Sequence, residues 1–273
     1  MKNQQVGMAA INGTEMYYEV AGDGHAIVLV HAGVADNRMW DDQFEAFAQY
    51  YKVIRFDQRG YGQTKPVNGE FKRYRDLYAL LTFLRIEQTY LMGCSMGGGA
   101  CIDFALEYPE MAKALITVGS GPGGFKTDTP PPPVWDALVK AFNENDLDQV
   151  NEYEAQVWLD GPYATAGRIG GAIREKMLVM NKIALQNEKL ELGKEISLDL
   201  TASTRLGELE LPSLIIYGDL DTPHIQAAGH YMAQHISGAK EIVMSGVAHL
   251  PSMEQPKALN DIVLSFLAQL SSV

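Results

Sequence analysis

Gly93-Cys94-Ser95-Met96-Gly97 is the stretch that decides the fold, because it gives one serine a setting in which it can become a nucleophile. The residues before it, 89–92, are apolar and partly β-branched, which predicts a buried strand. The residues after it, 98–108, repeat apolar side chains at helical spacing until Pro109 ends the pattern. The stretch therefore predicts a strand, a sharp turn and a helix. Glycine is needed on both sides of the turn because a Cβ there would clash.

Strands and helices alternate along the rest of the chain. Further strands are predicted at residues 8–11, 16–20, 26–30, 53–56, 114–118, 214–217 and 241–244. The first two are joined through Asn12-Gly13, a strong hairpin signal, and should form an antiparallel edge. Helices are predicted at residues 40–51, 74–84, 223–236 and 256–270. This alternation predicts an α/β fold with a mainly parallel sheet covered by helices on both faces.

The alternation is interrupted between the strands at 114–118 and 214–217. The sequence Gly121-Pro122-Gly123-Gly124 and the proline run 130–133 mark a linker, and the residues that follow read as helical. We therefore predict a core domain of residues 1–121 and 208–273, with a helical lid of residues 122–207 inserted into it. The lid should cover the edge of the sheet where the parallel strands end.

Composition narrows the classes of partner. Hydrophobic residues make up 47% of the 273 residues, and the formal net charge is −12, so nucleic acid and anionic membrane surfaces are not expected partners. Neither a secretory signal nor an apolar membrane span is visible, which favours a cytoplasmic protein. The two cysteines, Cys94 and Cys101, are expected to be free thiols, and no feature requires a metal or an organic cofactor.

Five short motifs containing glycine, histidine, serine or aspartate follow one another along the chain. They are His31-Ala32-Gly33, Asp57-Gln58-Arg59-Gly60-Tyr61-Gly62, Gly93-Cys94-Ser95-Met96-Gly97-Gly98, Gly218-Asp219-Leu220-Asp221 and Gly246-Val247-Ala248-His249. Their order and spacing resemble those of the α/β-hydrolase superfamily, in particular its single-lid esterases, enol-lactonases and carbon-carbon bond hydrolases. The resemblance implies a mostly parallel eight-stranded sheet with a lid after the sixth strand.

Serine needs a base, and the chain offers one at the right place. His249 follows the last predicted strand in a loop opened by Gly246, so it should emerge at the same sheet edge as Ser95. An acid must orient that histidine. Asp219 and Asp221 both follow the strand at 214–217, and the family pattern favours Asp221. The resemblance gives His31 a structural role beside the oxyanion loop.

Two backbone N–H groups should hold the oxyanion. Met96, at the helix start, is one expected donor. The second should come from the loop after His31, where Ala32 replaces the usual family glycine. Gly33 is preferred as that donor, with Val34 as the alternative. Asp57 and Arg59 are interpreted as braces of a loop.

The predicted function is hydrolysis of carboxylic esters of small to medium acyl groups, through an acyl-enzyme on Ser95. Enol-lactone hydrolysis is the nearest alternative. Carbon-carbon bond hydrolysis is less favoured because Cys94 stands where those relatives typically carry asparagine. Lyase and perhydrolase chemistry, or a ligand-binding receptor that keeps the fold, stay open. The sequence also leaves open whether the protein is a monomer or a homodimer. Candidate substrate contacts are Val34, Trp135, Trp158, Arg168 and Arg174, the two arginines as a clamp for one carboxylate.

Overall fold

An eight-stranded sheet forms the centre of the computed structural model, which describes residues 3–270. The strands lie in the order β1-β2-β4-β3-β6-β7-β9-β10. Strands β1 and β2 pair antiparallel, as do β2 and β4, and all other neighbours pair parallel. The bounds are β1 Gln5–Ile11, β2 Thr14–Ala21, β3 Ala26–Val30, β4 Lys52–Phe56, β6 Thr89–Cys94, β7 Ala112–Val118, β9 Ser213–Gly218 and β10 Lys240–Met244. The predicted mostly parallel eight-stranded sheet is confirmed.

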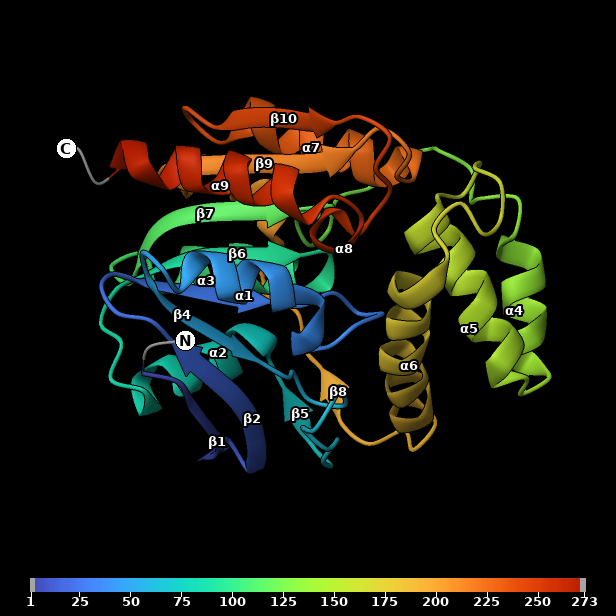
Figure 1. Cartoon of the computed structure of the whole chain (residues 1–273), viewed down its shortest axis with the longest axis horizontal. Coiled ribbons are helices and arrows are strands. Elements are labelled where there is room, and N and C mark those ends of the chain that lie inside the picture. Colours follow the sequence, from blue (N-terminus) through green and yellow to red (C-terminus); the bar gives the residue numbers. More distant parts are fainter. Residues whose placement is uncertain (1–2, 271–273) are drawn as a thin grey trace.

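Helices cover both faces of this sheet, and each face has its own apolar core. On one face α1 (Asp41–Phe47) packs with α9 (Pro256–Leu270), beside the short α8 (Pro251–Glu254). On the other face lie α2 (Arg73–Phe83), α3 (Met96–Glu107) and α7 (Pro223–His235). Strand β3 has no exposed residue, which explains its continuous apolar sequence. Figure 1 shows the parallel strands β6, β7, β9 and β10 pointing toward one side of the molecule.

The insertion between β7 and β9 lies on that side. Figure 1 places its helices α4 (Trp135–Asn143), α5 (Leu147–Ala155) and α6 (Gly171–Glu188) beyond the ends of the strands, with α6 nearest the sheet. A π-helical turn, Gln156–Asp160, extends α5. Short 3-10 turns at Ala202–Thr204 and Leu206–Glu208 lead back to β9.

We keep the name lid for residues 122–207. Its division from the core stays a prediction, and the core ends 1–2 and 271–273 lie outside the described residues.

Two small elements were not expected from the sequence. Strand β5 (Glu70–Phe71) pairs parallel with β8 (Lys194–Glu195) and joins the lid to the loop before α2. The lid is also tied to the core by Lys176, whose Nζ lies 2.7 Å from Asp41 Oδ2, and by Asn187, which donates to Gly60 O at 2.9 Å. Helix α6 is therefore attached to the core near both of its ends.

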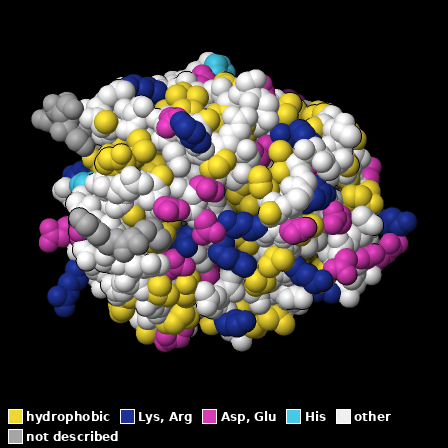
Figure 2. Space-filling model, viewed as in Figure 1, with side chains coloured by type: hydrophobic (Ala, Val, Ile, Leu, Met, Phe, Trp, Pro, Cys, Tyr) yellow, Lys and Arg dark blue, Asp and Glu magenta, His cyan; other side chains and the backbone are white. Residues whose placement is uncertain are grey.

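The surface mixes charges of both signs with apolar side chains on the face that Figure 2 shows. No helix among residues 3–270 is long and apolar enough to cross a bilayer.

Candidate active site

Ser95 occupies a sharp turn between β6 and α3. Its backbone has φ 52° and ψ −119°, a region that non-glycine residues rarely adopt. The turn is tight: a Cβ built on Gly93 would lie 2.3 Å from Gly97 O, and one on Gly97 would lie 2.3 Å from Val30 O. The Ser95 N–H donates to Val118 O at 2.9 Å, which ties the turn to the end of β7. The half-buried serine thus stands at the carboxyl edge of the sheet.

His249 and Asp221 meet at the same edge, on the loops that follow β10 and β9. His249 Nδ1 lies 2.7 Å from Asp221 Oδ2, and both side chains are buried. A hydrogen bond on Nδ1 leaves Nε2 as the nitrogen available to a serine hydroxyl. The neighbour of the serine reaches this loop as well, because Cys94 Sγ donates to His249 O at 3.6 Å.

The other candidate acid, Asp219, has a different environment. Its carboxylate accepts hydrogen bonds from Ser245 Oγ at 2.9 Å and from the Gly246 N–H at 2.7 Å. It therefore holds the start of the histidine loop rather than the imidazole. The geometry favours Asp221 as the residue that orients His249.

The two expected oxyanion donors lie beside each other. A Cβ built on Gly33 would stand 3.7 Å from Met96 Sδ and 3.9 Å from Met96 Cβ. Met96 is the first residue of α3, so its N–H belongs to the helix start, where amides have no partner within the helix. Gly33 lines a cavity, whereas Val34 packs in the apolar core. Gly33 is thus the better placed of the two alternatives.

His31 anchors the loop that carries Gly33. The Gln58 N–H donates to His31 Nε2 at 2.9 Å, so the ring proton is on Nδ1, which donates to Ala32 O at 2.8 Å. This neutral tautomer suits a fully buried ring, and burial lowers the pKa of His31 to about 4. The ring is therefore a structural brace, which agrees with the role that the resemblance gives it.

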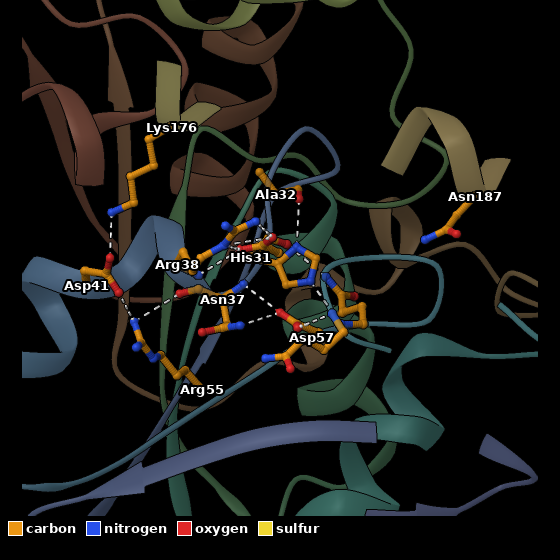
Figure 3. A network of polar contacts seen from close by, with 12 residues as sticks. His31, Ala32, Asn37, Arg38, Asp41, Arg55, Asp57, Lys176 and Asn187 are labelled. Carbon is orange, nitrogen blue, oxygen red and sulfur yellow. Dashed lines mark hydrogen bonds and ion pairs between the residues drawn. The ribbon is translucent and has the colours of Figure 1, made fainter. Parts of the chain in front are cut away.

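Asp57 holds the neighbouring loops together. It accepts from the Asn37 N–H at 2.9 Å, from Asn37 Nδ2 at 2.6 Å and from the Gln63 N–H at 2.7 Å. Burial raises the pKa of Asp57 to about 6. Figure 3 shows this network continuing through Arg55 and Asp41 to Lys176 of α6.

Arg59 pairs with Asp76 at 2.5 Å and donates to Asn12 O at 2.6 Å. Asp57 and Arg59 both have the bracing environment expected of them.

A cavity of about 350 Å³ opens beside the nucleophile. It is lined by Ser95 and Met96, by Gly99 and Asp103 of α3, and by His224 at the start of α7. Glu195 lines this cavity and also a second one of about 270 Å³ next to Gly33. Among the described residues that line the first cavity, none is lysine or arginine. Burial, with Glu195 nearby, raises the pKa of Asp103 to about 7.

Asp103 and His224 were not selected from the sequence. Asp103 lies eight residues after Ser95, which is about two turns along the same face of α3. Gly99 stands between them, and a Cβ there would meet only Gly121 O at 3.8 Å. That spacing on one helix face is the signal that could have found Asp103. His224 lies in the first turn of α7, and its place in the cavity follows from tertiary structure alone.

The predicted substrate contacts differ in their positions. The Trp158 ring packs against His249, with ring centroids 4.6 Å apart. Val34 lies in the apolar core, and Trp135 begins α4 at the outer side of the lid with 36% of its surface exposed. Only Trp158 of these three is beside the candidate catalytic residues.

Both candidate arginines are occupied by partners within the protein. Arg168 pairs with Glu254 and donates to three backbone carbonyls. Arg174 pairs with Asp160 at 2.9 Å and with Glu152 at 2.8 Å. The expected clamp for a substrate carboxylate does not fit this arrangement, because the guanidinium groups are already neutralised. The partners are acidic residues and carbonyls from distant segments, which the sequence pattern did not connect.

Cys94 and Cys101 are buried free thiols, as expected. Burial raises the pKa of the Cys94 thiol well above its usual range, so the thiolate needed for nucleophilic attack is disfavoured. Within residues 3–270 no group of three or more His, Cys, Asp or Glu side chains could hold a metal ion. Ser95 is therefore the candidate nucleophile at this turn.

A mostly parallel eight-stranded sheet is covered by helices on both faces, and Ser95 and the buried His249–Asp221 pair stand at one of its edges. The family model for the alpha/beta hydrolase fold matches residues 25–157. Together with the sheet topology, this match shows the α/β-hydrolase fold and a resemblance to the α/β-hydrolase superfamily.

Three relatives illustrate the similarity. The chain is 26% identical over 260 residues to the 2-hydroxy-6-oxononadienedioate/2-hydroxy-6-oxononatrienedioate hydrolase of Comamonas testosteroni, covering 91% of this chain and 89% of that one. It is 26% identical to the pimeloyl-[acyl-carrier protein] methyl ester esterase of Aeromonas hydrophila subsp. hydrophila, covering 90% and 96%. The crystal structure of the enol-lactonase from Burkholderia xenovorans LB400 superposes with a TM-score of 0.75 at 22% identity, covering 96% and 99%.

Proposed function

We propose that the protein is a serine hydrolase that cleaves carboxylic esters of small to medium acyl groups through an acyl-enzyme on Ser95. The observation that carries this proposal is the 2.7 Å contact between buried His249 and Asp221 at the sheet edge where Ser95 stands. A serine hydroxyl becomes a useful nucleophile only when a base takes its proton, and an acid must orient that base. The backbone N–H groups of Gly33 and Met96 are the proposed oxyanion donors that act with these three residues.

The proposed reaction has two halves. His249 Nε2 removes the proton from Ser95 Oγ as the oxygen attacks the ester carbonyl, and the Gly33 and Met96 N–H groups stabilise the oxyanion. The intermediate collapses to the acyl-serine, and the same proton passes from His249 to the departing alkoxide. A water molecule, activated by His249, then releases the acid and restores the serine.

The charge of the cavity favours esters over the substrates named for the first relative. A dioate substrate would bring carboxylates into a cavity lined by Asp103, where the described lining residues include no lysine or arginine. The other lining carboxylate, Glu195, is paired with Arg73 at 2.8 Å. Because Arg168 and Arg174 are neutralised by acidic partners, they do not supply the missing cation. Uncharged esters face no such repulsion. Enol-lactone hydrolysis uses the same steps and stays the second candidate, favoured by the fold match to an enol-lactonase.

The test is hydrolysis of p-nitrophenyl acetate, butyrate and octanoate by the wild type, Asp221→Asn and Asp219→Asn. We expect turnover by the wild type, with a chain-length optimum set by the 350 Å³ cavity. Asp221→Asn should lower kcat by about 10⁴-fold, the loss typical of the wrong imidazole tautomer. Asp219→Asn keeps one oxygen acceptor at the start of the histidine loop, so it is the matched comparison and should lose far less activity than Asp221→Asn. Loss of activity in Asp219→Asn alone would overturn the assignment of the acid.

A further inference from the structure

Three consecutive backbone N–H groups around His249 are held by only two residues. The N–H groups of Ala248 and Leu250 both donate to the Glu254 carboxylate, at 3.0 and 3.1 Å. The His249 N–H donates to Trp158 O at 3.3 Å. Glu254 ends α8, and only 1% of its side chain is exposed. The backbone of the candidate base is therefore fixed by one buried carboxylate and one carbonyl of the lid.

Arg168 connects these two holders. Its Nη2 donates to Leu159 O at 2.7 Å and its Nε to Asp160 O at 2.6 Å, both in the π-helical turn that contains Trp158. Its Nη1 donates to Gly246 O at 3.0 Å, at the start of the histidine loop, and Nη2 also pairs with Glu254. One guanidinium thus bonds to the lid turn, to the histidine loop and to the carboxylate that fixes that loop.

The backbone on either side of Arg168 is held by the buried carboxylate of Asp160. Asp160 accepts from the Gly167 N–H at 2.7 Å and from the Ile169 N–H at 3.0 Å, on either side of Arg168. The Trp158 ring covers the His249 ring on the lid side. The contacts form one continuous path from the lid backbone to the imidazole.

We propose that Arg168 and Glu254 are positioning residues for His249, and that the lid turn Gln156–Asp160 is a fixed part of the support of the catalytic base. This inference rests on the proposed function, because it assumes that His249 is the base. Small displacements of a catalytic group lower the rate of the chemical step without changing substrate binding to the same degree. A consequence is that substrate enters without lifting this turn. The interpretation of Arg168 as a substrate clamp makes the opposite prediction, an effect on KM that is confined to anionic substrates.

The test uses neutral p-nitrophenyl acetate and pre-steady-state acylation of Ser95. Arg168→Ala and Glu254→Ala should each lower the acylation rate constant by about 10- to 100-fold. The substrate dissociation constant, taken from the concentration dependence of the burst rate, should change less than about twofold. Glu254→Gln keeps an oxygen acceptor for the two N–H groups but loses the ion pair, so its rate should fall between the wild type and Glu254→Ala. Arg168→Lys should recover part of the rate, and it serves if Arg168→Ala does not fold. The double variant should be little slower than the slower single variant, because both residues act through one loop.

The matched control is Arg205→Ala. Arg205 also pairs with two carboxylates, Glu107 and Glu208, and its side chain is 18% exposed compared with 21% for Arg168. It should acylate at the wild-type rate. Arg168 and Glu254 variants that acylate like the wild type, or that weaken substrate binding alone, would overturn the inference, as would an equal loss in Arg205→Ala. If the wild type forms no acyl-serine, the proposed function fails instead.

Discussion

Replacing Ser95 by glycine and by alanine separates the strain of the turn from the chemistry of the hydroxyl. Both variants lose the nucleophile, so both should be inactive. They differ in the free-energy cost of holding the backbone at φ 52° and ψ −119°, since alanine keeps a Cβ in this unfavourable region and glycine does not. The comparison therefore measures the free energy of unfolding at one position with two inactive proteins.

The expected difference can be worked out from two opposing effects. A residue held in a sparsely populated backbone region costs about 1–3 kcal/mol, which glycine would release. Glycine also gives the unfolded chain more conformational freedom, which lowers stability by about 0.5–1 kcal/mol relative to alanine. Ser95→Gly should therefore be more stable than Ser95→Ala by about 1 kcal/mol. For a chain of this size that is a rise in Tm of about 2 °C.

Urea unfolding and thermal denaturation of both variants give the measurement. The control is Ala79→Gly in the interior of α2, where glycine should lower stability by about 1 kcal/mol. The two glycine substitutions should thus differ in sign. A Ser95→Gly protein less stable than Ser95→Ala, by the amount seen at Ala79, would refute the claim that the turn stores strain.

Three further predictions concern charge and packing. Because the pKa of Asp103 is raised to about 7, this carboxyl gains its negative charge between about pH 6 and 8. The charge repels a substrate carboxylate, so the ratio of kcat/KM for an uncharged ester to kcat/KM for an ω-carboxylate ester should rise over that range. In Asp103→Asn the ratio should stay flat, and a wild-type ratio that does not change would exclude this residue from the acyl site. Because the pKa of His31 is depressed in the folded protein, its neutral form contributes stability above pH 6.5 that is lost as pH falls through 4. The difference in the free energy of unfolding between the wild type and His31→Gln should therefore shrink by about 2–3 kcal/mol from pH 7.5 to 4. A constant difference would show that the ring is not held neutral. Gly97→Ala should destabilise the fold severely in urea unfolding, because its Cβ would lie 2.3 Å from Val30 O. Gly99→Ala should not, because its Cβ would make only an ordinary 3.8 Å contact with Gly121 O. Equal stability of the two variants would contradict the tight turn.

Much of the core was predictable because its signals are local. Strand β3 begins and ends where the sequence predicts, and helix α9 begins at the predicted Pro256, because a continuous apolar run and a proline mark these positions. Strand β5 pairs through only two residues that are not buried, so no hydrophobic pattern marks it. The turn at Ser95 was predictable for the same local reason as the strands.

The candidate site was only partly predictable, because much of it depends on contacts between distant segments. The alternation of strands and helices brings Ser95, Asp221 and His249 to one edge, and the sequence placed all three there. Their catalytic roles stay predictions. Arg168 was interpreted as a substrate contact because a sequence shows a charge but not its partner, and its partner Glu254 is 86 residues away. His224 lines the cavity through tertiary packing alone, whereas the helical spacing of Asp103 from Ser95 was a signal that the interpretation of the sequence did not use.

Mass spectrometry of the Ser95 peptide after a rapid acid quench with p-nitrophenyl butyrate tests the central claim most directly. We predict a butyryl group on Ser95 in the wild type, accumulating with the burst of p-nitrophenol, and no butyryl peptide or burst in Ser95→Ala. Butyryl transfer to another residue, or wild-type turnover with an unmodified Ser95 in both the burst and the steady state, would contradict the account.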